Sequence, residues 1–474
     1  MQKLALLLFM AALSACGGGG GADNTGTGAT NPVRSLQDKL QGVWQQRGYG
    51  VTVRVSGSSV ERFDTTSQTC FLTEKTDLDE LAGLQLSEDE STFAIRPTEL
   101  DFAEHYYKTD SLPAPCDSPV QNNSVDIYQH VWHSFNEYYA FFQERNVDWL
   151  AQRDLTRDLV NDATSDARLF EVLSTLILPL DDEHVFLDAG EQYFDPARSK
   201  GFLLQLVDEF NAQKEVADVN QYVNLELQKW DLVTREYYLD GAAASAADEA
   251  FLWGKITDRI GYLRMDAMIL NLTQRIEGQV KTVEGILDKI MTQMADTQGM
   301  IVDLRLNGGG ADPVAFAIAR RFADTERLVV SKFTRTVEGE GPRQDMYLGP
   351  VDRPSYLKPV VVITSKFSTS AAEVFTLAMR AWPQVTHIGE ATNGSLSDVL
   401  EKPLPNGWLI GLANEVYLDG EGNGFEASGI PPHIPVPVFR LEERRAGRDS
   451  ALEAALELLE SAAGLPRQEG LHTD

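Results

Sequence analysis

Residues 300–310 read MIVDLRLNGGG, a short apolar run that leads into consecutive glycines. Met300–Leu304 has the length and composition of a buried strand. Asp312 and Pro313 follow shortly after, and proline is favoured at the first position of a helix, where an acidic neighbour caps the N-terminus. The stretch therefore predicts a strand, a glycine-rich turn and a helix, in that order.

The glycine-rich turn suits an anion, because backbone N–H groups between a strand and a helix point at a negative charge. The phosphate-binding pattern Gly-x-x-x-x-Gly-Lys-Ser/Thr is absent, and Gly-x-Gly-x-x-Gly does not fit. The turn is compatible with an oxyanion that develops during acyl transfer. It is equally compatible with a tight turn of no chemical role, and the segment alone does not decide between the two.

A second strand, turn and helix begin at Pro359–Thr364, which reads PVVVIT. The turn ends at Ser370, and a helix is expected from Val374 to about Ala381. A serine at such a turn exposes its hydroxyl for nucleophilic attack, while the next backbone N–H points at the carbonyl oxygen. Ser370 and Glu373 also match a Ser-x-x-Glu capping box, which would only start the helix. The local sequence leaves both interpretations open.

Further strands and helices surround these two units. Gly261–Met265 predicts a strand, and the apolar positions of residues 276–294 recur with the spacing of an amphipathic helix. Asn406-Gly407 predicts a hairpin between Val399–Leu404 and Trp408–Ala413. Strands that alternate with helices predict an α/β domain with a mixed sheet.

The chain before this α/β core divides by composition. Short alternating runs separated by Gly and Ser predict a small β-rich domain, and aromatic residues at three- and four-residue steps from Val131 to Phe142 predict a helical segment. The expected divisions are a signal peptide at 1–15, a Gly-rich tether at 16–34, the β-rich domain at 35–120, the helical segment at 121–190, a helical connecting region at 191–255, the α/β core at 256–441, and a C-terminal helix and tail at 442–474.

The chain is acidic, since 71 Asp and Glu against 41 Lys and Arg in 474 residues give a net charge of −30. This charge excludes a nucleic-acid-binding protein that neutralises phosphates and a protein that docks on anionic lipid through a basic patch. The three cysteines and seven histidines show no zinc-ligand spacing. The acidic β-rich domain lacks the ligand order and the glycine of an EF-hand, so we interpret its carboxylates as a solvated face. We expect neither a metal nor another cofactor.

The N-terminus has the features of an export signal. Lys3 is the only charged residue before the apolar run Leu4–Leu13, which is too short to span a bilayer as a mature helix. The run ends Leu13-Ser14-Ala15-Cys16, which resembles the lipobox of bacterial lipoproteins, and a flexible Gly-rich tether follows. The alternative is an ordinary secretory signal with an incidental cysteine. We expect lipidation at Cys16 and, because Gly17 and not Asp comes next, an outer-membrane lipoprotein that faces the periplasm or the cell surface.

Two further cysteines, Cys70 and Cys116, lie 46 residues apart. Export would expose them to an oxidising compartment, which favours a disulfide. On the chain-entropy account such a bond would stabilise the fold by about 3–4 kcal/mol. The alternative is a pair of buried free thiols.

Four motifs occur in a fixed order between residues 255 and 440. They are Asp303-Leu304-Arg305-x-Asn307-Gly308-Gly309, Thr369-Ser370-Ala371-Ala372-Glu373, Gly389-Glu390-Ala391-Thr392-x-Gly394 and Gly429-Ile430-Pro431-Pro432. In combination they resemble the C-terminal-processing (tail-specific) serine peptidase family. The resemblance implies a crotonase-like or ClpP-like core with a mixed sheet, hydrolysis through an acyl-enzyme, and a peptide or an unfolded protein as substrate.

Two branches of this family differ in the base that activates the serine. In the processing branch a lysine follows Gly-Glu-x-Thr-x-Gly, but the position here holds Ser395, whose hydroxyl is no base at neutral pH. Lys366, four residues before Ser370, is an alternative base. The tricorn-like branch uses a histidine and a glutamate, and the resemblance assigns these roles to His184 and Glu426. Histidine suits the role because its pKa lies near neutrality.

The resemblance also implies the remaining parts of the site. Glu426 would complete the hydrogen-bonded arrangement that positions the catalytic groups. The N–H groups of Gly308 or Gly309 and of Ala371 would bind the oxyanion.

Several features depart from the tricorn-like pattern or qualify it. Glu183 stands where tricorn has a serine of the active-site network, and His433 replaces the aspartate usual after Gly-Ile-x-Pro, which would affect a structural contact. Asp181, Asp182 and Glu183 lie beside His184, and we expect their charges to favour its protonated state.

Three kinds of function are compatible with this chain. The leading hypothesis is a lipid-anchored serine peptidase; the alternatives are an inactive binding protein on the same fold and a hydrolase of non-peptide esters. Residues 190–255 show no peptide-binding PDZ pattern, so we do not predict recognition of a free C-terminus. We expect no nucleic-acid partner and a membrane contact only through the N-terminal lipid; the oligomeric state is left open.

Overall fold

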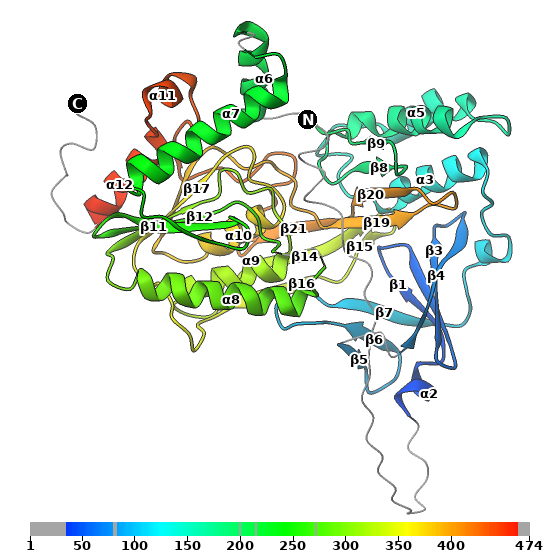
Figure 1. Cartoon of the computed structure of the whole chain (residues 1–474). Coiled ribbons are helices and arrows are strands. Elements are labelled where there is room, and N and C mark those ends of the chain that lie inside the picture. The colour runs from blue at the N-terminus through cyan, green and yellow to red at the C-terminus, as the bar shows by residue number, and fades with distance from the viewer. Residues whose placement is uncertain (1–34, 79–82, 199–200, 214–215, 271–272, 463–474) are drawn as a thin grey trace, which may run out of the picture.

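Figure 1 shows the computed structural model of the chain, which describes residues 35–78, 83–198, 201–213, 216–270 and 273–462. The predicted signal peptide, the Gly-rich tether and Cys16 lie outside these residues. The buried apolar side chains form four clusters: one in the N-terminal sheet, one in the helical segment and one on each face of a central sheet. Within the described ranges, no helix combines the length and the apolar character needed to cross a membrane.

The N-terminal domain is a seven-stranded antiparallel sheet in the order β4-β3-β2-β1-β7-β6-β5. Its strands alternate as a half-buried sheet requires: in β2, Val53 and Val55 are buried while Arg54 and Ser56 are exposed. The buried face packs around Trp44. The elements are α2 (Leu36–Leu40), β1 (Gly42–Gln46), β2 (Val51–Ser56), β3 (Ser59–Thr65), β4 (Cys70–Asp77), β5 (Leu84–Leu86), β6 (Thr92–Ile95) and β7 (Glu104–Thr109).

A disulfide links this sheet to the chain that leaves it. Cys70 begins the edge strand β4, Cys116 lies in the short 3-10 turn Ala114–Asp117, and their Cα atoms are 4.8 Å apart. The N–H of Val120 also donates to the Cys70 carbonyl at 2.9 Å. The start of the helical segment is therefore fixed to the sheet at this point.

The helical segment packs its helices around an aromatic core. The rings of Phe135 and Trp149 lie 5.4 Å apart, and both side chains are buried. The strand β8 that ends the segment pairs antiparallel with β20, so the hairpin predicted at Asn406-Gly407 joins a four-stranded sheet, β19-β20-β8-β9. The elements are α3 (Ser124–Tyr138), α4 (Trp149–Thr156), α5 (Asp166–Ile177), β8 (Phe186–Asp188), β9 (Tyr193–Phe194), β19 (Val399–Pro403) and β20 (Leu409–Ala413).

The central sheet has the order β10-β11-β12-β13-β17-β18-β22, with β12 to β22 parallel and β10 and β11 antiparallel at one edge. Every residue of β13 and β17 is buried, as expected for parallel strands that are covered on both faces. The strands are β10 (Ala244–Ala246), β11 (Phe251–Thr257), β12 (Ile260–Met265), β13 (Gly299–Asp303), β17 (Val360–Thr364), β18 (Val385–Gly389) and β22 (Ile434–Pro435).

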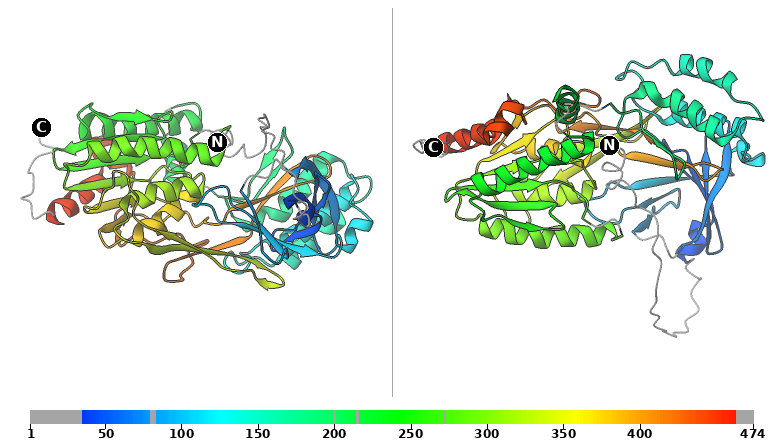
Figure 2. Two further views of the ribbon diagram at one scale, coloured as in Figure 1. Left: turned by 90° about the horizontal axis from the view of Figure 1, so that it is seen from below. Right: turned by 45° about the horizontal axis from the view of Figure 1, so that its top comes forward.

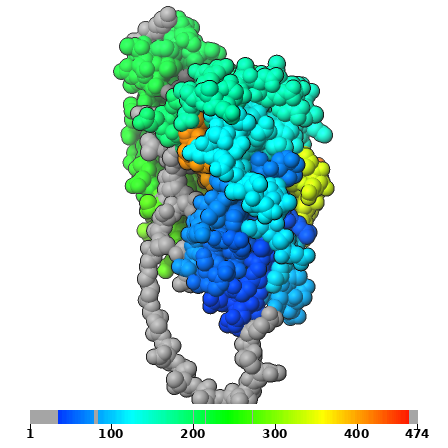
Figure 3. Space-filling model, turned by 90° about the vertical axis from the view of Figure 1, so that its right-hand side faces the viewer, coloured from blue at the N-terminus to red at the C-terminus, as the bar shows by residue number. Residues whose placement is uncertain are grey.

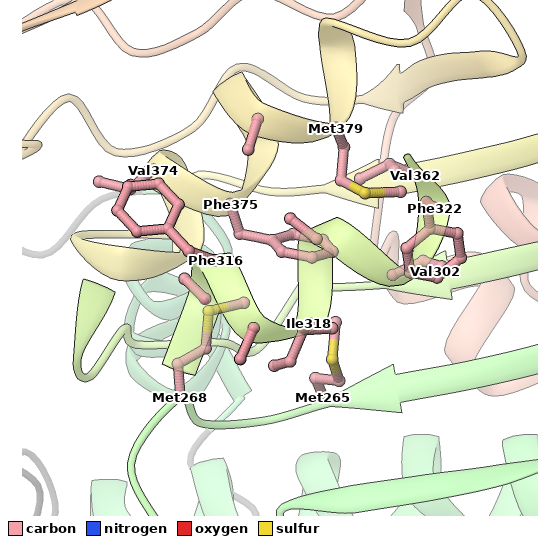
Figure 4. Close-up of a cluster of buried hydrophobic side chains, with 14 of the residues drawn as sticks. Met265, Met268, Val302, Phe316, Ile318, Phe322, Val362, Val374, Phe375 and Met379 are labelled. Atoms are coloured by element: carbon pink, nitrogen blue, oxygen red, sulfur yellow. The ribbon is translucent and has the colours of Figure 1, made fainter. Parts of the chain in front are cut away.

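Helices cover both faces of this sheet (Figure 2). Met300 and Val302 of β13 belong to the cluster with α8, α9 and α10, while Ile301 belongs to the cluster with α6, α7 and α12. Figure 4 labels Phe316 and Phe375 among the buried side chains of the first of these clusters. The helices are α6 (Gly201–Gln213), α7 (Val219–Leu232), α8 (Ile276–Gln293), α9 (Asp312–Ala319), α10 (Ala371–Arg380), α11 (Leu441–Ala446) and α12 (Ser450–Ala462).

A smaller sheet lies between the central sheet and the N-terminal domain (Figure 1). Its longest strand, β14, pairs antiparallel with β15, β16 and β21. The strands are β14 (Arg327–Thr336), β15 (Gly339–Glu340), β16 (Gln344–Leu348) and β21 (Glu415–Asp419).

The predicted α/β core with a mixed sheet is confirmed, but two details of the prediction are wrong. The strand β10 and the first part of β11 fall within the connecting region 191–255 that was expected to be helical, because pairing of β11 with β10 and β12 overrides the helical bias of the stretch before it. The C-terminal helix is two helices, α11 and α12, separated at Gly447, whose φ of 66° is left-handed.

The N-terminal domain packs against the helical segment, as the blue and cyan surfaces of Figure 3 show. Ser67 donates from its N–H and its hydroxyl to the carboxylate of Glu137 in α3, at 2.8 and 2.7 Å. Lys402 of β19 pairs with Asp64 of β3 at 2.8 Å, and both side chains are buried. These polar contacts fix the N-terminal sheet beside the site described next.

Candidate active site

Ser370 lies in the turn between β17 and α10, with φ 56° and ψ −128°. Residues with a side chain rarely adopt this conformation, and strain of this kind is typical of a nucleophile at a strand-to-helix turn. Two hydroxyls fix the turn to the end of β13: Ser365 Oγ donates to the carbonyl of Arg305 at 2.6 Å, and Ser368 Oγ donates to that of Leu304 at 2.8 Å.

Glu373 connects the start of α10 to the loop 392–395. Its Oε1 accepts from Thr392 Oγ1 at 2.6 Å and from the N–H of Gly394 at 2.8 Å, and its Oε2 accepts from the N–H groups of Ser395 at 2.9 Å and Ser370 at 3.2 Å. Burial raises the pKa of Glu373 to about 7, although these donors lower it. The glutamate of the predicted capping box thus also holds the loop beside Ser370.

Gly309 lies directly against Ser370. A Cβ added at Gly309 would be 2.6 Å from the Ser370 Cβ, and the φ of +95° is unfavourable for any side chain, so only glycine fits. The N–H of Gly309 donates to Asn307 Oδ1 at 2.8 Å. Among the described residues, the N–H groups of Gly308 and Ala371 have no acceptor. Of the two glycines proposed from the sequence, Gly308 is therefore the one whose N–H is open to an oxyanion.

Ser395, at the position of the processing-branch lysine, and Lys366, the alternative base suggested by sequence, both lie at the loop 392–395. The Ser395 carbonyl accepts from the Ser370 N–H at 3.0 Å, and its hydroxyl donates to Asn393 Oδ1 at 3.1 Å. Lys366 Nζ donates to the Thr392 carbonyl at 3.3 Å. Both side chains therefore contact the loop 392–395.

His184 lies just before β8, and its side chain is only 1% exposed. Its backbone N–H donates to Asp182 Oδ1 at 2.9 Å, and the Tyr139 hydroxyl donates to Asp182 Oδ2 at 2.8 Å. Burial lowers the pKa of His184, while Asp182 and Asp398 oppose this effect and Arg145 adds to it. Asp182 thus favours the protonated ring as expected, but burial outweighs it, and the net effect is a lowered pKa of His184.

The acids on either side of Asp182 make other contacts. Asp181 Oδ1 accepts from the N–H of Arg198 at 2.9 Å. Glu183 Oε1 accepts from Asn393 Nδ2 at 2.6 Å. The departure at Glu183 thus joins the segment that bears His184 to the loop that holds Ser370.

Glu426 is buried beside the same loop. Its Oε1 accepts from Arg145 Nη2 at 2.8 Å, and its Oε2 accepts from the N–H groups of Leu396 at 2.8 Å and Ser397 at 3.3 Å. Burial and the nearby Asp182 raise the pKa of Glu426 to about 8, although Arg145 lowers it. Glu426 therefore accepts hydrogen bonds from the loop backbone and from Arg145.

Sequence reasoning missed Arg145. It belongs to none of the four motifs. Its place beside the site depends on contacts with Asp181, Gly394 and Glu426, which are distant in sequence. The other departure, His433, makes the structural contact expected of it, since its Nδ1 accepts from the N–H of His387 at 3.1 Å.

Comparison with known proteins shows which family this part of the chain resembles. Residues 259–436 match Peptidase family S41. The chain carries a peptidase S41 domain. Ser370, Glu426 and the glycine-rich turn lie within the S41 domain, whereas His184 and Arg145 precede it.

Two curated relatives each match a part of the chain. Tricorn protease homolog 1 of Streptomyces coelicolor is 31% identical over 167 residues, which are 34% of this chain and 14% of that protein. The carboxy-terminal-processing protease of Bartonella bacilliformis is 26% identical over 198 residues, which are 42% of this chain and 43% of that protein. The chain thus spans less than half the length of these relatives.

A solved structure extends the similarity beyond the S41 domain. The "putative peptidase" of Parabacteroides merdae is 25% identical, with a TM-score of 0.57 over 72% of this chain and 97% of that one. Since 72% of this chain is covered, the shared architecture extends beyond residues 259–436.

Proposed function

We propose that the chain is an exported, lipid-anchored serine peptidase that cleaves peptide bonds through an acyl-enzyme on Ser370. The observation that supports it most is the strained turn at Ser370 next to two open N–H groups, those of Gly308 and Ala371. A nucleophile and an oxyanion site at one point are what acyl transfer requires. The S41 domain and the peptidase names of its relatives support a peptide or an unfolded protein as substrate.

In this proposal His184 is the base. It takes the proton of the Ser370 hydroxyl as Oγ bonds to the substrate carbonyl carbon, and the carbonyl oxygen becomes an oxyanion on the two N–H groups. The C–N bond then breaks, and His184 gives the proton to the leaving amine. Water attacks the acyl-enzyme, its proton passes through His184 to Ser370 Oγ, and the acid product leaves. Glu426 contributes by holding the loop 396–397 and Arg145.

Labelling with a fluorophosphonate tests the nucleophile. We expect the folded wild-type protein to be labelled at Ser370 and Ser370→Ala to take up no label and to hydrolyse no peptide. Ser428→Ala, which removes an exposed hydroxyl near the loop, is the matched control and should label like the wild type. Absence of label in wild type, or an unchanged peptidase rate in Ser370→Ala, would contradict the proposal; cleavage of an ester panel but no peptide library would reassign the substrate.

Export and lipidation predict the covalent state of the mature chain. We expect intact-mass analysis of protein from the membrane fraction to show loss of residues 1–15, an acylated Cys16 and a disulfide between Cys70 and Cys116. The lipobox-like end of the signal and the adjacent Cys70 and Cys116 sulfur atoms support this state. Cys16→Ser should abolish both processing and membrane attachment. A wild-type chain that retains Leu13 or carries no lipid would contradict it.

A further inference from the structure

We propose that Arg145 is a positioning residue that docks the segment bearing His184 onto the core bearing Ser370. This inference rests on the proposed function, because it concerns how base and nucleophile meet. Arg145 follows α3, and its side chain is only 4% exposed. A buried guanidinium needs partners on all sides, and those of Arg145 come from three segments.

On one side Arg145 holds the segment of the base. Its Nη1 donates to the carbonyls of Leu180, at 3.5 Å, and Asp181. Its Nε lies 3.2 Å from Asp182 Oδ2. Asp182 in turn accepts the backbone N–H of His184, so the contact passes through one residue to the base.

On the other side Arg145 holds the loop of the nucleophile. Its Nη2 donates to the carbonyl of Gly394 at 3.3 Å and to Glu426 Oε1 at 2.8 Å. The next carbonyl along the loop, that of Ser395, accepts the N–H of Ser370 at 3.0 Å. The guanidinium of Arg145 therefore connects the segment that holds His184 with the loop that holds Ser370.

Charge gives the contact its strength. Asp182 and Glu426 are 0% and 8% exposed, and both face Arg145, whose charge lies beside the buried Asp182 and opposes the rise in the pKa of Glu426. Their separate directions match the five fixed donors of a guanidinium, whereas the single ammonium of lysine has no such fork. Removing Arg145 would leave the buried Asp182 without its cation, raise the pKa of Glu426 further and free the base segment from the loop.

The test separates acylation from binding in wild type, Arg145→Ala and Arg145→Lys. With a fluorophosphonate we expect kinact of Arg145→Ala to fall by about 10²-fold, the cost of displacing a catalytic group by about 1 Å, while KI stays within the experimental error. Guanidinium chloride at millimolar concentration should restore part of kinact, and sodium chloride at equal ionic strength should not. Arg145→Lys keeps the buried charge and should retain the fold with an intermediate kinact.

Arg335→Ala is the matched control. Arg335 lies in the same region and donates to the carbonyl of Ala140 at 3.3 Å and to Glu144 at 2.6 Å, but it contacts neither the base segment nor the loop. Its kinact should equal that of wild type. Equal kinact in Arg145→Ala and wild type, or a loss shared by kinact and KI that guanidinium does not reverse, would overturn the inference and leave the proposed function standing.

Hydrogen exchange tests the docking without using the reaction. We expect faster exchange in residues 181–188 and 394–397 of Arg145→Ala than in wild type, and no change there in Arg335→Ala. Unchanged exchange would overturn the inference. If wild-type protein took up no label, the proposed function would fail, and the exchange result would still decide whether Arg145 joins the two segments.

Discussion

Replacement of His184 by alanine is expected to lower the rate of Ser370 acylation by about 10²–10⁴-fold, the usual contribution of a positioned base. We expect this effect because Glu183, Asn393 and Arg145 join the segment that bears His184 to the loop beside Ser370, where a base is needed. The measurement is the second-order rate constant of fluorophosphonate labelling. His105→Ala, which removes an exposed histidine of β7, is the control and should react like wild type.

The pH profile of the same reaction identifies the base. His184 accepts a proton only in its neutral form, and burial lowers its pKa below the ordinary value of 6.5. Lowering the pKa keeps the ring neutral at more acidic pH, so the acid limb of the labelling rate should lie below pH 6.5. An acid limb above pH 6.5, or a His184→Ala variant with the rate and profile of wild type, would rule out His184 as the base.

Replacement of Lys402 by methionine is expected to lower the free energy of unfolding by about 3–5 kcal/mol, because breaking a buried ion pair leaves the other charge uncompensated. Lys402 Nζ lies 2.9 and 2.8 Å from the two oxygens of Asp64, and the side chains are 0% and 4% exposed. The pair joins β19 of the S41 domain to β3 of the N-terminal sheet. Urea denaturation at neutral pH measures the change.

A surface pair of the same type provides the comparison for Lys402. Lys255 Nζ lies 2.7 Å from Asp296, but the side chains are 34% and 71% exposed. Solvent screens such a pair, so Lys255→Met should cost less than about 1 kcal/mol. If the free energy of unfolding fell by a similar amount in both variants, the buried pair would contribute no more to stability than the surface pair.

The fold of the core was accessible from sequence because its signals are local. Two mainly apolar strands that are each followed by a turn and a helix, at Met300–Leu304 and Pro359–Thr364, correspond to β13 and β17 of the central sheet. The strands β10 and β11 were missed because pairing, of β10 with β11 and of β11 with β12, and not their local composition, determines them.

The residues of the candidate site could be predicted from sequence only where a motif marks them. Ser370, the glycine-rich turn and Glu426 were named from motif positions, and the structure brings the His184 segment to the same loop. Arg145 has no local signature, since its partners are Asp181, Gly394 and Glu426. The pKa direction of His184 was misjudged for a similar reason, because burial cannot be seen in a run of neighbouring acids.

The proposed base, His184, and the proposed nucleophile, Ser370, lie beside different hydrophobic clusters. Leu180 and Val185, on either side of His184, pack with the helical segment, whereas Ala371 and Val374 next to Ser370 pack in the central core. If His184 is the base, opening of the helical segment would withdraw it while Ser370 keeps its turn. Such molecules would keep a folded central sheet but would have no activity. We therefore expect activity to be lost on heating at the temperature of this local opening, below the temperature at which the central sheet unfolds.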